Sequence, residues 1–183
     1  MATTFTDEDI VAAVNGMWIL IAGVLCFMMQ AGFGLLEVGM VRSKNAQNIM
    51  IKNLIDVAVA ALSYYAVGYG IAYGEGGSPF LGKSYFFLNG MEDYIGWFFQ
   101  FVFAGTTATI VSGAVAERCQ FRAYLIYSAI LTAFIYPVAS HWIWSGDGWM
   151  AGKVLDYAGG GAVHGVGGTA ALSAAWILGP RIG

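Results

Sequence analysis

A histidine set among glycines is the residue of this sequence best suited to chemistry. His164 lies in the run GGGAVHGVGG at 159–168, and imidazole is the side chain best able to exchange protons near neutral pH. Residues four apart share a helix face, so Gly160, His164 and Gly168 form a stripe without bulk above or below the ring. The pattern suits an imidazole lining a narrow channel, and an interhelical hydrogen bond is an equally good interpretation.

Three further residues could act on a cation. Asp156 precedes the glycine run, where a carboxylate stabilises a helix N-terminus by about 0.3–1 kcal/mol and would also support a nearby cation. We do not expect it to bind the cation directly. Aromatic rings such as Phe103 and Trp144 attract cations by about 0.5–1 kcal/mol when exposed and about 2 when desolvated. Taken alone, however, these two aromatic residues are better interpreted as packing groups.

Other polar residues fall in or beside apolar runs. Glu37 closes the first run, and we expect it near the inner membrane interface and hydrogen-bonded. Asp56 and His141 are interpreted as helix-end or packing groups. Pro137 interrupts the fourth run and predicts a local kink, because proline removes a backbone donor.

Several classes of protein have no support in the sequence. There is no His-Glu-x-x-His metal motif, no phosphate-binding glycine loop and no nucleophile paired with a base, so we predict neither a metal site, a cofactor nor enzyme activity. The net charge is −3 and no basic block occurs, which gives a nucleic-acid partner no footprint. The spacing of Cys26 and Cys119 favours structural roles.

The elements that position these residues are predicted to be membrane spans. Hydrophobic residues form 58% of the chain and charged residues 10%, whereas soluble domains are about 25% charged. A bilayer core of about 30 Å requires about 20 apolar residues of helix. We therefore predict an all-α integral membrane protein with one membrane domain over 1–183 and five spans, near 10–36, 49–74, 94–116, 123–146 and 157–180.

The basic residues predict an orientation. Alternation of the five spans places most of them on one side: Arg42, Lys44, Lys52, Arg118, Arg122 and Arg181. Only Lys83 and Lys153 fall on the other side. The positive-inside rule then places the N-terminus outside and the C-terminus in the cytoplasm. Tryptophans near the outer span ends fit an interfacial belt: Trp97, Trp142, Trp144 and Trp149.

The fifth span also carries a stripe of small residues. Gly161, Gly165, Thr169 and Ser173 are spaced by four, which predicts close packing on another helix.

The number of spans is odd. A second five-span unit following this one would therefore enter the membrane inverted, as in many transporters. The chain has no internal repeat, so it is predicted to be one such unit.

Five stretches carry a resemblance to a known family. They are QAGFGLLEVGMVRSKNA at 30–46, GAVAERC at 113–119, YPVASHWIWS at 136–145, DYAGGGAVHGVGGT at 156–169 and LGPR at 178–181. In this order, across all five spans, the chain resembles the N-terminal half of the ammonium transporter / methylammonium permease / Rhesus family.

The resemblance implies a fold and a mechanism. Members are homotrimers in a plasma or bacterial inner membrane, and each protomer has its own pore, built largely from two inverted five-helix halves. Trp144 and Phe103 would belong to the outer cation site and its gate, Asp156 would support that site, and His164 would be the first of two pore histidines. Ammonium, or methylammonium, is recruited outside and deprotonated. Ammonia then crosses a hydrophobic pore, and in many members the proton crosses by a separate polar route.

The sequence departs from that pattern by ending after the fifth span. The second histidine, a second gate phenylalanine and a hydroxyl of the outer site would come from a second half, so we expect a fragment that requires this half. A cytoplasmic regulatory protein, known for part of the family, is a possible partner. The alternatives are a membrane ammonium sensor, with the same site residues and an output domain beyond residue 183, and a non-functional or structural membrane subunit.

Overall fold

The computed structural model describes residues 5–182. Within them, five helical segments are long and apolar enough to cross a membrane: Asp7–Met40, Ser43–Tyr73, Tyr94–Val115, Phe121–Trp144 and Gly160–Leu178. The described chain contains no strand, and only an isolated bridge joins Ser78 to Leu81. The prediction of an all-α membrane protein with five spans is confirmed, with helix ends that differ from the predicted ones by a few residues.

Three of the five spans are interrupted by a π turn, a wider turn that is often found at functional sites. The α-helices are α1 (Asp7–Met40), α2 (Ala46–Ser63), α3 (Tyr69–Tyr73), α4 (Tyr94–Val115), α5 (Phe121–Ile130), α6 (Tyr136–Trp144) and α7 (Val166–Leu178). The π turns are Tyr64–Gly68 between α2 and α3, Leu131–Ile135 between α5 and α6, and Gly160–Gly165 before α7.

The interruption predicted at Pro137 takes the form of one of these turns. Pro137 lies in the first turn of α6, directly after the π turn Leu131–Ile135. Proline cannot donate to the preceding turn of an α-helix, so the wider turn re-forms the backbone hydrogen bonds before the helix continues. The fourth span is therefore one interrupted helix and not two separate ones.

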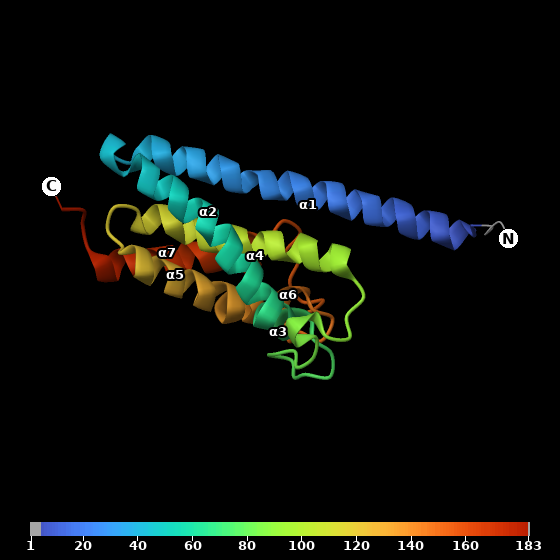
Figure 1. Cartoon of the computed structure of the whole chain (residues 1–183). Helices are drawn as coiled ribbons and strands as arrows, with labels where there is room; N and C mark the ends of the chain where they lie inside the picture. The colour runs from blue at the N-terminus through green and yellow to red at the C-terminus, as the bar shows by residue number, and fades with distance from the viewer. Residues whose placement is uncertain (1–4, 183) are drawn as a thin grey trace.

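Helix α4 lies at the centre of the bundle. It packs against α1, α2 and α7, while α2 also contacts α5, and α3 contacts α6 (Figure 1). Helix α1 runs along one side, and its N-terminal turns extend beyond the other helices (Figure 1). Only 6% of its most apolar window is buried, against 61% for α4. Most side chains of α1 are therefore left uncovered by the rest of the described chain.

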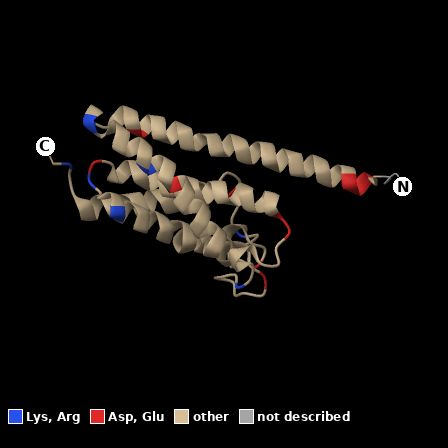
Figure 2. Ribbon diagram, in the orientation of Figure 1, with Lys and Arg blue, Asp and Glu red and all other residues tan. Residues whose placement is uncertain are grey.

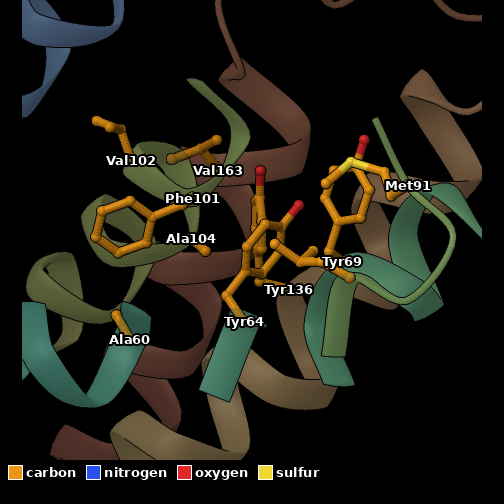
Figure 3. Close-up of a cluster of buried hydrophobic side chains, with 10 residues drawn as sticks. Ala60, Tyr64, Tyr69, Met91, Phe101, Val102, Ala104, Tyr136 and Val163 are labelled. Atoms are coloured by element: carbon orange, nitrogen blue, oxygen red, sulfur yellow. The ribbon is translucent and has the colours of Figure 1, made fainter. Parts of the chain in front are cut away.

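The largest buried cluster joins the second, third and fourth spans to the start of the fifth. Figure 3 shows the rings of Tyr64 and Tyr136 beside each other, with Phe101 and Val163 across from them. The two tyrosine rings are 6.2 Å apart between centroids, and both side chains are fully buried. This cluster fixes the position at which the glycine-rich fifth span meets α4.

The small-residue stripe of the fifth span is not covered by the described chain. Gly161, Gly165, Thr169 and Ser173 are all exposed. The residue that approaches α4 is Gly167, where an added Cβ would lie 3.0 Å from Cβ of Ile110. Close packing of the stripe on another helix therefore stays a prediction, and the contact with α4 uses a different face of the span.

The two ends of the bundle differ in charge. One end carries the loops 41–45 and 116–120 and the C-terminal residues, and most lysines and arginines gather there (Figure 2). We call it the basic end. The other end carries the loops 74–93 and 145–159, and we call it the aromatic end because tryptophans and phenylalanines pack there: Phe80, Trp142 and Trp149.

Candidate functional site

The carboxylate of Asp156 closes the N-terminal end of the fifth span. Its Oδ2 accepts hydrogen bonds from the backbone N–H groups of Gly161 at 3.0 Å and Ala162 at 2.9 Å. Gly159 has a φ of 76°, a left-handed conformation that glycine adopts without strain and that turns the chain back over the carboxylate. The first turn of a helix leaves its N–H groups without partners, and Asp156 supplies an acceptor for two of them. The interpretation of Asp156 as a helix N-terminal carboxylate is confirmed.

Trp144 joins the end of the fourth span to this turn. Its indole Nε1 donates to the backbone oxygen of Asp156 at 2.8 Å. Its ring meets Phe103 edge to face, with centroids 5.9 Å apart, and Phe103 meets Phe99 in the same way at 4.9 Å. Three aromatic residues from two helices are thereby held beside Asp156.

These groups line a pocket of about 340 Å³ at the aromatic end. Its walls are Phe99, Gln100, Phe103, Trp144, Asp156, Tyr157 and Ala158. Ring faces attract a small cation, and the carboxylate adds a negative charge at the edge of the pocket. The oxygen Oε1 of Gln100 is buried without a hydrogen-bond partner, so it is an available acceptor in this wall.

The structure brings together three of the four predicted site residues and leaves the fourth apart. Phe103, Trp144 and Asp156 line one pocket, whereas His164 is exposed and does not. The backbone N–H of His164 donates to the oxygen of Gly159 at 2.9 Å, within the π turn. His164 therefore lies on a face of the fifth span that no other part of the described chain covers.

Sequence reasoning missed Phe99 and Gln100. Gln100 precedes Phe103 by three residues on α4, so the two side chains lie on the same helix face. A glutamine inside a long apolar run was the signal that could have found this wall of the pocket, because polar groups inside a membrane span are costly.

A second polar region lies near the basic end, between α1, α2, α4 and α5. The carboxylate oxygen Oε2 of Glu37 accepts from Asn53 and from Ser112, both at 2.9 Å. The expectation that Glu37 is hydrogen-bonded near the end of its span is confirmed. Asp56 is fully buried and accepts from the hydroxyls of Thr109, at 3.1 Å, and Ser128. Of the two interpretations of Asp56, a packing group inside α2 is therefore the one that the structure supports.

His141 is a packing group, as interpreted, but one with defined partners. The ring is fully buried, with Nδ1 2.8 Å from the backbone oxygen of Ala72 and Nε2 3.0 Å from that of Ser78. It fastens the loop that follows α3 onto α6. His141 does not line the pocket of Phe103 and Trp144.

A third cluster fastens the loops of the basic end. Glu117 accepts from the side chain of Asn45 at 2.6 Å and from the backbone N–H and Nε of Arg42 at 3.0 and 3.1 Å. Arg181 approaches at 3.5 Å. The hydrogen bonds from Asn45, and then those from Arg42, lower the pKa of Glu117 to about 2, from an ordinary value of 4.5.

Comparison with known proteins identifies the family. Residues 17–183 match the profile described as Ammonium Transporter Family. The chain belongs to the ammonium transporter family. It is 48% identical to putative ammonium transporter 1 of Caenorhabditis elegans, an alignment that covers 93% of this chain and 34% of the relative. It is 45% identical to ammonium transporter Amt2 of Archaeoglobus fulgidus, covering 93% and 39%.

Solved structures of ammonium transporters share the fold. The crystal structure of Mep2 from Candida albicans superposes with a TM-score of 0.84 at 34% identity, over 91% of this chain and 39% of Mep2. A structure titled Sensor Amt Protein superposes with a TM-score of 0.90 at 38% identity, over 95% of this chain and 46% of the other. The chain thus spans less than half the length of these relatives. The relatives are named as transporters and not as enzymes, and the family together with the five apolar helices indicates a multi-pass membrane protein.

Proposed function

We propose that this chain forms the N-terminal half of a transporter that moves ammonium or ammonia across a cell membrane. The observation that carries the proposal is the pocket in which Phe103 and Trp144 stand beside the carboxylate of Asp156, at the opening of the fifth span, in a member of this family. Ammonium, or methylammonium, would be recruited there between the aromatic faces. Asp156 would support the site through its charge while its Oδ2 remains bonded to the backbone.

Deprotonation follows from the cost of carrying a charge through a narrow apolar pore. An isolated ion loses far more solvation free energy in a low-dielectric medium than a neutral molecule does. Ammonium can avoid this cost by releasing a proton and crossing as ammonia. Potassium has no proton to release, so the same step rejects it. In this proposal His164 lines the pore that ammonia enters.

The exposure of His164 supports a second half. A histidine that faces lipid would be costly, so the uncovered face of the fifth span is expected to meet another protein surface. We propose that an inverted five-helix half covers it and that the completed protomers form a homotrimer. The basic end would face the cytoplasm, with the N-terminus outside. The loops of that end would be the contact for any cytoplasmic regulatory protein.

A sensor would share the same recruitment residues. The relatives from Caenorhabditis elegans and Archaeoglobus fulgidus, at 48% and 45% identity, are named as transporters, whereas the structure titled Sensor Amt Protein is 38% identical. Transport is therefore the function we propose.

Ammonium-induced current in proteoliposomes tests the proposal. The chain would be reconstituted alone and together with the second half of a relative such as Amt2 of Archaeoglobus fulgidus. We expect no current from the chain alone, current from the combination, and loss of that current in His164→Ala. Current from the chain alone would show that it assembles a pore without a second half. Absence of current from a correctly assembled combination would refute the transport proposal.

A further inference from the structure

Three charged side chains are buried near the basic end, away from the pocket of Phe103 and Trp144. Glu37 on α1 is 5% exposed, Lys52 on α2 is 4% exposed and Asp56 on α2 is not exposed. The two carboxylates are neighbours, because Asp56 and Asn53, which donates to Glu37, are three residues apart on one face of α2. If all three were ionised, two negative charges and one positive charge would leave a net charge of −1 in this interior. An uncompensated charge in such a place costs several kcal/mol.

The side chains that hydrogen-bond to the two carboxylates supply no positive charge, and the exposed cations Arg42 and Lys44 lie outside the buried cluster, along the pocket that Lys52 also lines. Helix α4 contributes only hydroxyls, from Thr109 and Ser112. The other ionisable neighbours are Tyr124 and Tyr127 on α5 and Cys119 in the adjoining loop, and these are neutral or negative. A single bound proton would bring the interior to neutrality.

The hydrogen bonds indicate where that proton binds. Both carboxylate oxygens of Asp56 are occupied, Oδ1 by Ser128 and Oδ2 by Thr109. In Glu37, Oε2 accepts from two donors, whereas Oε1 is buried and accepts from none. Of the four carboxylate oxygens, Oε1 of Glu37 is the one that no donor reaches. A carboxylate oxygen that carries negative charge and has no donor is costly to bury, and a proton at this oxygen removes that charge.

Tyr124 on α5 belongs to the same cluster. Its side chain is fully buried, and its hydroxyl interacts with Tyr127 and with Ser112, which donates to Oε2 of Glu37. Helix α5 therefore adds neutral hydroxyls to the hydrogen bonds of Glu37 and no positive charge.

Unpartnered oxygens also lead from the outer pocket toward this region. Gln100 on α4 lines the pocket with its Oε1 unbonded, and Gln30 on α1 has a buried Oε1 in the same state beside Gly105 of α4. Gln30 precedes Glu37 by seven residues, which places it on the same face of α1, about 10 Å farther along the axis. The three oxygens of Gln100, Gln30 and Glu37 form a descending series of acceptors.

The site is close to water at the basic end. A pocket of about 440 Å³ opens there, and both Ile49 and Lys52 line it. Asn53 bridges this wall to the carboxylate, because its Nδ2 contacts the oxygen of Ile49 at 3.1 Å as well as Oε2 of Glu37. Glu37 itself lies in the last turn of α1. One layer of side chains therefore separates it from the aqueous pocket.

We propose that Glu37 and Asp56 hold one exchangeable proton, on Oε1 of Glu37, and that the proton released from ammonium leaves the membrane through this site. The second part rests on the proposed transport function. Ammonium at the outer pocket separates into ammonia and a proton, and the N–H bond breaks there. An O–H bond forms at Oε1 of Glu37 and breaks again when the proton passes to water in the pocket lined by Lys52.

The bound proton can be detected without any transport. In infrared spectra of the chain in lipid bilayers at neutral pH, a protonated carboxyl gives a C=O stretch that ionised carboxylates lack. We expect this band in the wild type, with a shift in heavy water because the proton exchanges, and its loss in Glu37→Gln. The matched control is Glu8→Gln, an exposed carboxylate on the same helix, which should retain the band. A wild type without the band, or a band that survives in Glu37→Gln, would overturn the assignment.

The transport role is tested by measuring the movement of charge and the entry of ammonia as two separate signals. With the second half supplied, current and interior alkalinisation are recorded together. Glu37→Gln keeps the shape of the side chain and an acceptor for Asn53 and Ser112, so we expect ammonia to enter and alkalinise the interior while current falls roughly a hundredfold. Unchanged current, or loss of ammonia entry together with current, would contradict a separate proton exit at Glu37. If the wild type itself moves nothing, the transport proposal fails, while the infrared band still decides whether the proton is bound.

Discussion

The pocket at the aromatic end and the carboxylate network near the basic end are both polar regions inside one membrane bundle, but they are built differently. The pocket is open and its polar contacts involve the backbone, through Asp156 and Trp144. The network is closed, and its side chains bond mostly to one another across four helices. One region is prepared to receive a cation, and the other is already filled by the chain itself.

This difference indicates which parts of the chain are complete. The network buries Lys52 and Asp56 within residues 5–182, so its contribution to stability should be present in this chain alone. The pocket lies at the start of the fifth span, whose face at His164 is uncovered. Its function should therefore depend on another surface, and changes there should affect transport more than folding.

The largest effect on stability is expected from removing the buried cation. Lys52→Met keeps the length of the side chain but leaves Glu37 without its positive neighbour and the backbone oxygen of Cys119 without its 3.1 Å donor. We expect the free energy of unfolding to fall by about 3 kcal/mol at neutral pH, because an uncompensated buried charge remains. Chemical unfolding in detergent micelles, followed by circular dichroism, measures the change.

Lys44→Met provides the control for this comparison. Lys44 is an exposed lysine at the same end, so its replacement should change the free energy of unfolding by no more than about 0.5 kcal/mol. Equal effects of the two substitutions would mean that the network does not depend on its buried charge, and the contrast between the two regions would then be lost.

A smaller effect is expected at the outer pocket. Asp156→Ala removes the acceptor for the N–H groups of Gly161 and Ala162, and loss of such a helix cap costs about 1–2 kcal/mol. Asp156→Asn retains a side-chain oxygen and should recover most of this stability. The same unfolding measurement applies to both variants. If Asp156→Ala cost as much as Lys52→Met, the pocket would be as strongly integrated into the fold as the network.

Much of the fold could be predicted from the sequence because lipid restricts the choice of structure. A backbone in a bilayer must form helices, so long uncharged runs predict spans directly. The predicted limits of the first span were less accurate, because the charged residues Asp7 and Glu37 both lie inside α1, one at its exposed N-terminal end and the other in the buried network.

The site was predicted less completely, for two physical reasons. The π turn at the start of the fifth span, and the approach of Gly167 to α4, could not be predicted from single residues. The choice between a helix-end and a packing role for Asp56 stayed open, because its partners, the hydroxyls of Thr109 and Ser128, are far away in the sequence and only the packing of α2, α4 and α5 brings them together. Taken alone, Phe103 and Trp144 were better interpreted as packing groups, and it was the resemblance to a family that assigned them to a cation site beside Asp156.

The smallest effect is expected outside the membrane-spanning segments, at Glu117 in the loop between α4 and α5. This residue has a φ of 64°, which is unfavourable for a side chain other than glycine, so the bonds from Asn45 and Arg42 help to hold the loop. Its folded pKa of about 2 lies below the ordinary 4.5, so the stabilisation is complete above about pH 4.5 and is lost as the pH falls toward 2. We expect the difference in Tm between the wild type and Glu117→Gln to shrink over that range and to stay constant from pH 5 to 7. A difference that is the same at pH 3 and pH 6 would show that Glu117 stabilises the loop through shape and not through charge, unlike the buried network beside it.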